Sequence, residues 1–161
     1  FRVSLLPIVS LMTAQAIHAF FICFMFAMFL YYGYSAELYW LQIPYYLFSL
    51  SVLLMGLSWL TSSIVVFFKD MGQFVAMMIQ FGFWLTPIFW SMKMVPEKYH
   101  WIVQLNPLVY IIDGYRNSMI YHQWFWNDIN MTLYFWLVTA GIFILGGLTF
   151  RKLRPHFADV L

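Results

Sequence analysis

The sequence predicts an all-α polytopic membrane protein with four transmembrane helices and a re-entrant external helical hairpin before the last span. Hydrophobic residues make up 64% of the 161 residues and charged residues 9%, and the mean hydropathy is +0.80. Soluble domains carry about 25% charged residues, so this chain has too little polar surface for a water-facing globule. The few charges also divide the chain into apolar stretches near the roughly 20 residues that a spanning helix needs.

The predicted spans are helices, because backbone groups in lipid must be hydrogen-bonded within their segment and no alternating strand pattern appears. They run roughly over residues 7–30, 41–67, 72–88 and 129–150. Pro44 falls at the start of the second span, where its missing N–H costs little. Pro87 falls near the end of the third span and is expected to kink or end it. No linker or repeat separates the spans, so residues 1–161 are predicted to form a single transmembrane domain.

The distribution of Lys and Arg predicts which side of the membrane each connection faces. Four crossings put both ends of the chain on one side. That side receives Arg2, Lys69, Arg151, Lys152 and Arg154, and the other side receives Lys93, Lys98 and Arg116. Because cytoplasmic segments carry the excess of Lys and Arg, both ends of this chain are expected in the cytoplasm.

Residues 92–126 would then form an external segment before the last span, and stretches such as "WIVQL" make it too apolar for a solvated loop. Pro96 and Glu97 suit the first turn of a short helix, since a helix N-terminus favours negative charge. Asn106 and Pro107 suit the cap and first position of a second helix. Two half-length helices joined by a break favour a re-entrant hairpin that closes the outer end of a path. The alternative is an external cap with no further role.

Neither a catalytic nor a metal-binding constellation appears in the sequence. The histidines are scattered without metal-ligand spacing, and neither a P-loop nor a dinucleotide-binding glycine motif occurs. Cys23 has no partner for an internal disulfide. We therefore expect a transport subunit rather than an enzyme, with no metal and no cofactor of its own. Any ATP that drives transport would be used by a partner chain.

Polar and charged residues leave several alternatives open. Gln15 and His18 share a face of the first span, where they could contact a sugar-phosphate substrate or form the more usual interhelical hydrogen bond. Asp113 and Arg116 could pair with each other on one helix or bind across a dimer. The candidates for contact with an ATPase are Arg2, Lys69 and Asp70, although Lys69 could instead lie among lipid headgroups.

Aromatic residues make up 23% of the chain, more than interfacial anchoring requires. Their faces can stack on sugar C–H surfaces, and Tyr O–H and Trp N–H groups can form hydrogen bonds. The aromatic candidates for a substrate path are Phe81, Trp84, Phe89, Tyr99, Trp101, Tyr110 and Tyr115. Tyr110 and Tyr115 lie about 140° apart around a helix, so we expect one of them to pack against the bundle instead.

The stretch "LTPIFWSMKMVPEKYHWIVQLNPLVYIIDGYRN" resembles the outer segment of ABC-2-type export permeases. The resemblance is strongest to the polysaccharide branch, which exports O-antigen, capsule or wall teichoic acid and often shows TPI, VPE, NP and GYR in this order. Those places are filled by Thr86, Pro87, Ile88, Val95, Pro96, Glu97, Asn106, Pro107, Gly114, Tyr115 and Arg116. The segments "LLPIVSL", "FKDMGQF" and "FRKLRPHFADVL" resemble the start of the third span, the inner turn and the C-terminus of that branch.

This resemblance implies a six-span permease of which the chain would be the C-terminal four-span portion. The hairpin would correspond to the gate helices, with Pro96, Glu97, Asn106, Pro107, Asp113 and Arg116 as its residues of interest. The resemblance further implies a homodimer in the bacterial plasma (inner) membrane. A separate nucleotide-binding ATPase subunit would drive export of a lipid-linked glycan. Two alternatives are an ABC-2 exporter of drugs or small lipids and a structural membrane subunit that transports nothing.

Overall fold

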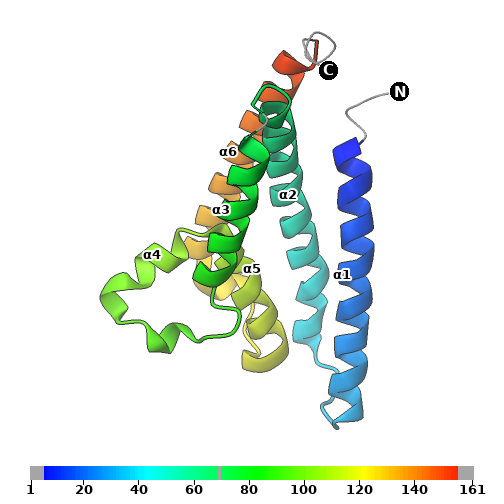
Figure 1. Cartoon of the computed structure of the whole chain (residues 1–161). Coiled ribbons are helices and arrows are strands. Elements are labelled where there is room, and N and C mark those ends of the chain that lie inside the picture. The colour runs from blue at the N-terminus through cyan, green and yellow to red at the C-terminus, as the bar shows by residue number, and fades with distance from the viewer. Residues whose placement is uncertain (1–5, 69, 156–161) are drawn as a thin grey trace.

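The computed structural model describes residues 6–68 and 70–155, and every regular element in these two ranges is a helix. The long helices are α1 (Leu6–Tyr31), α2 (Ile43–Val65), α3 (Met71–Leu85) and α6 (Ile129–Leu153). They run roughly along one direction, and α1 begins at the same end of the bundle at which α6 finishes (Figure 1). The all-α fold predicted from the sequence is thereby confirmed.

Three segments are long and apolar enough to cross a membrane. They comprise residues 7–31, 38–65 and 125–153, with lengths of 25, 28 and 29 residues. α3 has only 15 residues, about 22 Å at 1.5 Å per residue, whereas a bilayer core is about 30 Å thick. The third predicted span, residues 72–88, is therefore shorter as a helix than the sequence indicated.

Pro87 is the reason why α3 ends early. The residue before a proline is driven out of the helical region, and Thr86 has an extended backbone with φ −77° and ψ 132°. The expectation that Pro87 kinks or ends this helix is confirmed. Pro44 also lies in the first turn of α2, as predicted.

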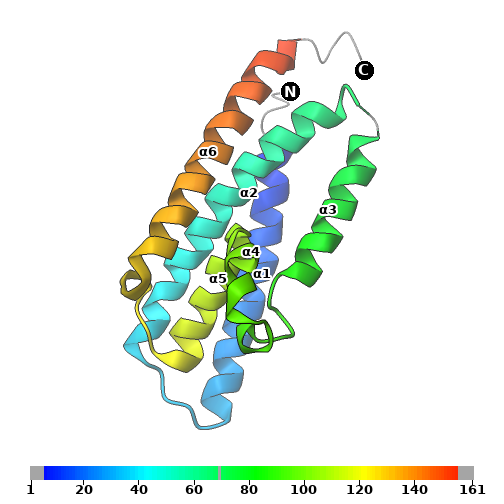
Figure 2. The ribbon, with the colours of Figure 1, turned by 90° about the vertical axis from the view of Figure 1, so that its left-hand side faces the viewer.

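The helix pair α2 and α6 forms the best-packed part of the bundle, and the two helices lie side by side in both ribbon views (Figures 1 and 2). The buried positions of α2 and the residue before it alternate steps of four and three, a spacing typical of left-handed helix packing. They include Gln42, Tyr46, Ser49, Leu53, Gly56 and Ser63. Small residues allow backbones to approach closely. A Cβ added to Gly56 would lie 2.8 Å from the Cα of Phe143, and one added to Gly146 would overlap the carbonyl oxygen of Gly56.

α1 and α3 pack far less than this pair. Ile22 is the only fully buried hydrophobic side chain on α1 among the described residues, and none of the described side chains of α3 is buried. α1 packs on α2 around Ile22 and Ile43, and its Phe26 stacks on Trp40, in the turn before α2, with ring centroids 4.9 Å apart. α3 stands apart from α1 and touches the rest of the bundle mainly through α2 (Figure 2).

The segment between α3 and α6 folds into short helices. They are η3 (Met92–Met94), η4 (Glu97–Tyr99), α4 (His100–Gln104), α5 (Pro107–Arg116), the π-helical η5 (Asn117–Tyr121) and η6 (Phe125–Asp128). The α4 side of this segment projects from the bundle, whereas α5 lies against it (Figure 1). Asn106 caps α5, because its Oδ1 accepts a hydrogen bond of 3.0 Å from the N–H of Leu108. The predicted break between two short helices at Asn106 and Pro107 is confirmed, while its depth in a membrane stays a prediction.

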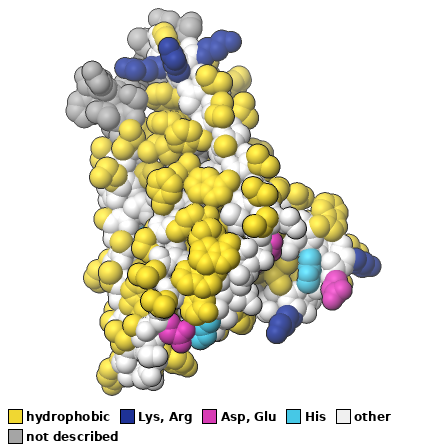
Figure 3. All heavy atoms as spheres, turned by 180° about the vertical axis from the view of Figure 1, so that it is seen from behind, with side chains coloured by type: hydrophobic (Ala, Val, Ile, Leu, Met, Phe, Trp, Pro, Cys, Tyr) yellow, Lys and Arg dark blue, Asp and Glu magenta, His cyan; other side chains and the backbone are white. Residues whose placement is uncertain are grey.

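Charged side chains separate along the bundle. Arg151, Lys152 and Arg154 lie at the end where α6 finishes, and Figure 3 shows Lys and Arg side chains both at that end and on the projecting segment. A broad hydrophobic surface lies between them. This arrangement matches a protein whose middle faces lipid and whose ends face water. The multi-pass membrane character expected from composition follows from it.

Candidate functional site around α5

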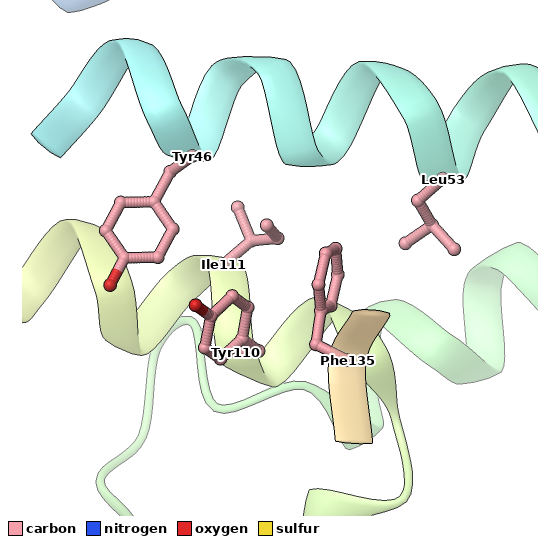
Figure 4. Close-up of a cluster of buried hydrophobic side chains, with 5 residues drawn as sticks. All are labelled: Tyr46, Leu53, Tyr110, Ile111 and Phe135. Carbon is pink, nitrogen blue, oxygen red and sulfur yellow. The ribbon is translucent and has the colours of Figure 1, made fainter. Parts of the chain in front are cut away.

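The α5 helix, which the sequence placed in an external hairpin, is packed deeply into the bundle. Val109, Tyr110 and Ile111 are almost fully buried, and Figure 4 shows Tyr110 and Ile111 in the cluster that α5 forms with α2 and α6. The ring of Tyr110 stacks on Phe135 of α6 with centroids 4.7 Å apart. The segment between α3 and α6 is therefore anchored to the bundle by α5, through these buried side chains.

A chain of hydroxyl groups joins α5 to α2 and α6. The hydroxyl of Tyr110 lies 3.0 Å from the hydroxyl of Tyr45 and 3.1 Å from Oγ1 of Thr132. The indole N–H of Trp136 donates to the Tyr45 hydroxyl at 2.8 Å. Buried polar groups must find partners, so this network favours one arrangement of the three helices over others.

Gly114 allows α5 to approach the ring of Tyr46. A Cβ at this position would overlap the side chain of Tyr46, so glycine is required by space rather than by backbone conformation. The hydroxyl of Ser118, one turn later, is buried and donates 2.7 Å to the carbonyl of Gly114. The glycine of the "GYR" triplet thus fixes how closely α5 packs on α2.

A second set of contacts ties the end of α3 to α5; we call it the clasp, and it consists of Thr86, Ile88, Asn106 and Arg116. Nδ2 of Asn106 donates 2.8 Å to Oγ1 of Thr86, which in turn donates to the carbonyl of Gly82 on α3. Nη2 of Arg116 donates 3.0 Å to the carbonyl of Ile88. These contacts bring the TPI motif to the NP and GYR motifs across 20 and 28 residues of sequence.

Asp113 pairs with Arg116 on the same helix at 3.5 Å, as the sequence allowed. Burial raises the pKa of the Asp113 carboxyl, and the nearby guanidinium of Arg116 opposes part of this change. Since both side chains keep some exposure, the pair itself stabilises the fold only modestly. The larger role of Arg116 is its hydrogen bond to the Ile88 carbonyl, which could not be read from sequence spacing.

Gln42 connects two more distant segments. Its side chain is 2% exposed, donates 2.9 Å to the carbonyl of Gln123, and accepts 2.7 Å from the N–H of Phe125. One amide therefore fastens the segment before α2 to the segment before α6. Sequence reasoning missed Gln42, although a lone amide beside the start of a predicted span was a usable signal.

A polar cavity of about 180 Å³ opens beside α5. Tyr46 and Tyr110 form part of its wall from within the bundle, and the rest comes from α5, from the end of α4 and from residues 123–131. It is lined by Tyr46, Gln104, Tyr110, Asp113, Gly114, Asn117, Gln123, Trp124, Phe125, Asn127, Asp128 and Met131. Amide, carboxylate and hydroxyl groups make this cavity distinct from the apolar grooves along α1.

Gln15 and His18, the polar residues of α1 that the sequence singled out, do not line that cavity. Nε2 of Gln15 donates 2.9 Å to Oγ of Ser51 on α2, which is the interhelical hydrogen bond that the sequence offered as one alternative. The ring of His18 meets the ring of Tyr115 edge-on, with centroids 5.9 Å apart. The Tyr115 hydroxyl is buried and has no hydrogen-bond partner within the described part of the chain.

The remaining aromatic candidates are exposed on α3 and on the projecting segment. The largest exposures are those of Phe81, Trp84, Phe89 and Trp101, at 60–79%, and Tyr99 lies 4.7 Å under the ammonium group of Lys98. Tyr110 and Tyr115 both pack against the bundle from α5, so the expectation that only one of them would do so is wrong. α5 lies among several helices, and Tyr110 meets Phe135 of α6 while Tyr115 meets His18 of α1. A substrate contact for any of these aromatics stays a prediction.

The other predicted positions lie at the ends of elements. Pro96 precedes η4, Glu97 begins it, and Asp70 precedes α3 without capping it through its side chain. Arg2 and Lys69 lie outside the described residues. Tyr45, Tyr46, Thr132 and Trp136, which hold α5 in place, were not identified as site residues from the sequence.

Comparison with known proteins places the chain in a family. Residues 3–120 match the family model of the ABC-2 type transporter. Two proteins of Klebsiella pneumoniae, each described as an O-antigen export system permease protein RfbA, are 33% identical to the chain over 132 residues. The aligned region covers 81% of this chain and 49% of each relative, so the chain spans about half the length of these relatives. The family match over residues 3–120 shows that this chain belongs to the ABC-2 type transporter family.

Proposed function

We propose that this chain forms part of the permease of an ATP-driven exporter of a lipid-linked polysaccharide, such as an O-antigen, a capsule or a teichoic acid. The observation that carries the proposal is the clasp. It is built from the motifs through which the sequence resembles the polysaccharide branch, and it joins α3 to α5. The 33% identity to two O-antigen export permeases supports the same substrate class.

The energy for export comes from a separate ATPase subunit in this proposal. The sequence has no phosphate-binding glycine loop, and a permease of this family acts as a transport subunit rather than an enzyme. The ATPase would bind at the end of the bundle where Arg151, Lys152 and Arg154 lie and where α2 connects to α3 (Figures 1 and 3). Asp70 lies at that connection, and Lys69 and Arg2 are further candidates by sequence.

The substrate path in this proposal runs along the exposed aromatic face of α3 and is completed by a second copy of the permease. Trp84 and Phe81 supply flat faces that tolerate different sugars, because stacking needs no particular hydroxyl pattern. The projecting segment and α5 close the outer end of this path. The clasp would transmit a shift of α3 to the gate, since it holds the two helices by hydrogen bonds rather than by a broad apolar contact.

Reconstitution into liposomes tests this function. The complete permease together with its ATPase subunit should move a lipid-linked glycan across the membrane when ATP is supplied, and the permease alone should not. Export without the ATPase, or transport of small lipids and drugs with no transport of glycan, would contradict the proposal.

Labelling of single cysteines tests the proposed orientation. Lys98→Cys and Lys152→Cys are placed separately in a Cys23→Ser background, and intact cells receive a membrane-impermeant thiol reagent. We expect labelling at position 98 only, because the projecting segment should be external and the end of α6 cytoplasmic. The reverse pattern would invert the orientation.

A further inference from the structure

The polar cavity beside α5 has lining groups that the fold does not use. Within the part of the chain that the structure describes, the side chains of Gln104, Asn117, Gln123 and Asn127 have no hydrogen-bond partner in the protein. Each primary amide offers two N–H donors and one carbonyl acceptor. The four amides come from three segments: the end of α4, the start of η5 and the connection before α6. Free donors and acceptors that converge from separate segments suit a ligand with several hydroxyl groups.

Aromatic rings form one side of the same cavity. Trp124 lines it, and the ring of Trp126 is stacked on Trp124 with centroids 4.6 Å apart and an angle of 7° between the planes. The ring of Tyr39, in the turn before α2, also contacts Trp124, with centroids 5.1 Å apart. Neighbouring rings hold Trp124 in place without hydrogen bonds, so its orientation is set before any ligand arrives. An indole face packs well on the C–H surface of a sugar ring.

The charge of the cavity favours a neutral ligand. Asp113 and Asp128 are the only ionisable carboxylates among its lining residues, and no Lys or Arg lines it in the described structure. Arg116 is engaged with Asp113 and with the Ile88 carbonyl. A phosphate or an acidic sugar would therefore meet negative charge without compensation. The volume of about 180 Å³ is below the roughly 300–1,000 Å³ of sites for drug-sized ligands, which suits one ring rather than an oligosaccharide.

We propose that this cavity binds a single neutral sugar ring, with the amides of Asn117 and Asn127 on its hydroxyl groups and Trp124 against its C–H face. The role of this site in export rests on the proposed function, because a neutral unit of the emerging glycan would then occupy the cavity. The binding of a sugar to the cavity does not rest on the proposed function. A free sugar in the surroundings has the same chemistry and is distinguished by the experiment below.

Saturation-transfer NMR on the complete permease in nanodiscs tests the binding, with the neutral methyl glycosides of glucose, galactose and mannose as probes. We expect saturable transfer for at least one glycoside. Asn117→Ala/Asn127→Ala should weaken its affinity about tenfold, because two ligand hydrogen bonds are lost. Asn130→Ala is the matched control: Asn130 is exposed in the first turn of α6, does not line the cavity, and its substitution should leave the affinity unchanged. Glucuronic acid should bind more weakly than the neutral glycosides.

Three results would overturn the proposal: no transfer to any neutral glycoside, equal affinity in the double variant and in the control, or tighter binding of the acidic sugar. An unfolded double variant is recognised by a lowered thermal midpoint, and Trp124→Leu then replaces it with the same expected loss.

Export by the same variants separates the two sources of sugar. Slower ATP-driven export by Asn117→Ala/Asn127→Ala assigns the bound ring to the exported glycan, whereas unchanged export with lost binding assigns it to a free sugar. ATP-driven glycan export by a wild-type protein that binds no glycoside leaves the proposed function intact and rejects this site. Glycoside binding by a wild-type protein that exports no glycan supports this site and rejects the proposed function.

Discussion

The unit of α2, α5 and α6 packs very differently from the two helices α1 and α3, although the long helices of both regions are strongly apolar. The first unit buries Tyr46, Leu53, Tyr110 and Phe135 almost completely and links its helices through buried hydroxyl groups. α3 buries none of its described side chains, and α1 buries very few. An apolar side chain that faces lipid is already in an apolar environment, so packing it against another helix releases no hydrophobic free energy. Hydrophobicity alone therefore does not decide which helices contact each other.

The difference between the two regions lies in small residues and hydroxyl groups at the right spacing. Along α2, Ser49, Gly56 and Ser63 recur every seven residues on the face that meets α6. The glycines of α3 have no comparable neighbours: a Cβ added to Gly82 would meet nothing within 4 Å. Backbone proximity and hydrogen bonds therefore define the rigid part of this chain. The clasp is the main polar link from that part to the loosely packed α3.

The largest effect is expected where the two backbones of the rigid part meet. Gly146→Leu would force its side chain into the carbonyl of Gly56 and should lower the free energy of unfolding by about 3 kcal/mol. Gly82→Leu, on α3, is the matched control and should change it by less than about 0.5 kcal/mol. Thermal unfolding in detergent measures both. Equal losses at the two positions would remove the distinction between the packed and the loose region.

A smaller loss is expected at the clasp. Thr86→Val keeps the shape of a buried side chain but leaves Nδ2 of Asn106 without its acceptor, which should cost about 1–3 kcal/mol. Hydrogen exchange should rise at the end of α3 and at the start of α5, and should stay unchanged in the middle of α6. Thr13→Val is the control, since Thr13 is exposed on α1 and bonds only the carbonyl of Val9. An exchange pattern that is the same for Thr86→Val and for the wild type would mean that the clasp does not hold α3.

The smallest effect concerns pH. Because the pKa of Asp113 is raised in the folded state, folding favours the protonated carboxyl. Stability from this group is therefore fully present below the unfolded pKa of about 3.9 and is lost as pH rises through the folded value. Asp113→Asn should flatten this part of the stability curve and should be at least as stable as the wild type at neutral pH. A variant that is clearly less stable at neutral pH would show that the pair with Arg116 outweighs burial.

Sequence reasoning could predict the helices but not most of their contacts. Composition and charge spacing placed three spans within a few residues, and the steric rule for the residue before a proline explains why α3 stops at Leu85. The cap by Asn106 was predictable because it depends on neighbours in the chain. The bonds from Arg116 to Ile88 and from Gln42 to Phe125 were not, because they join segments 28 and 83 residues apart. The four residues of the clasp all belong to the motifs that suggested the family, but only the fold reveals that they contact one another.

Export by the Asn106→Ala/Pro107→Ala variant tests the central claim most directly, namely that the break between α4 and α5 couples the loosely packed α3 to the rigid bundle. The substitutions remove the cap of α5, the bond to Thr86 and the break itself, so the two short helices can fuse into one. The complete permease should still assemble with its ATPase subunit and hydrolyse ATP, but should lose glycan export. Export at the wild-type rate would contradict the account and would reduce the segment to a cap on the bundle.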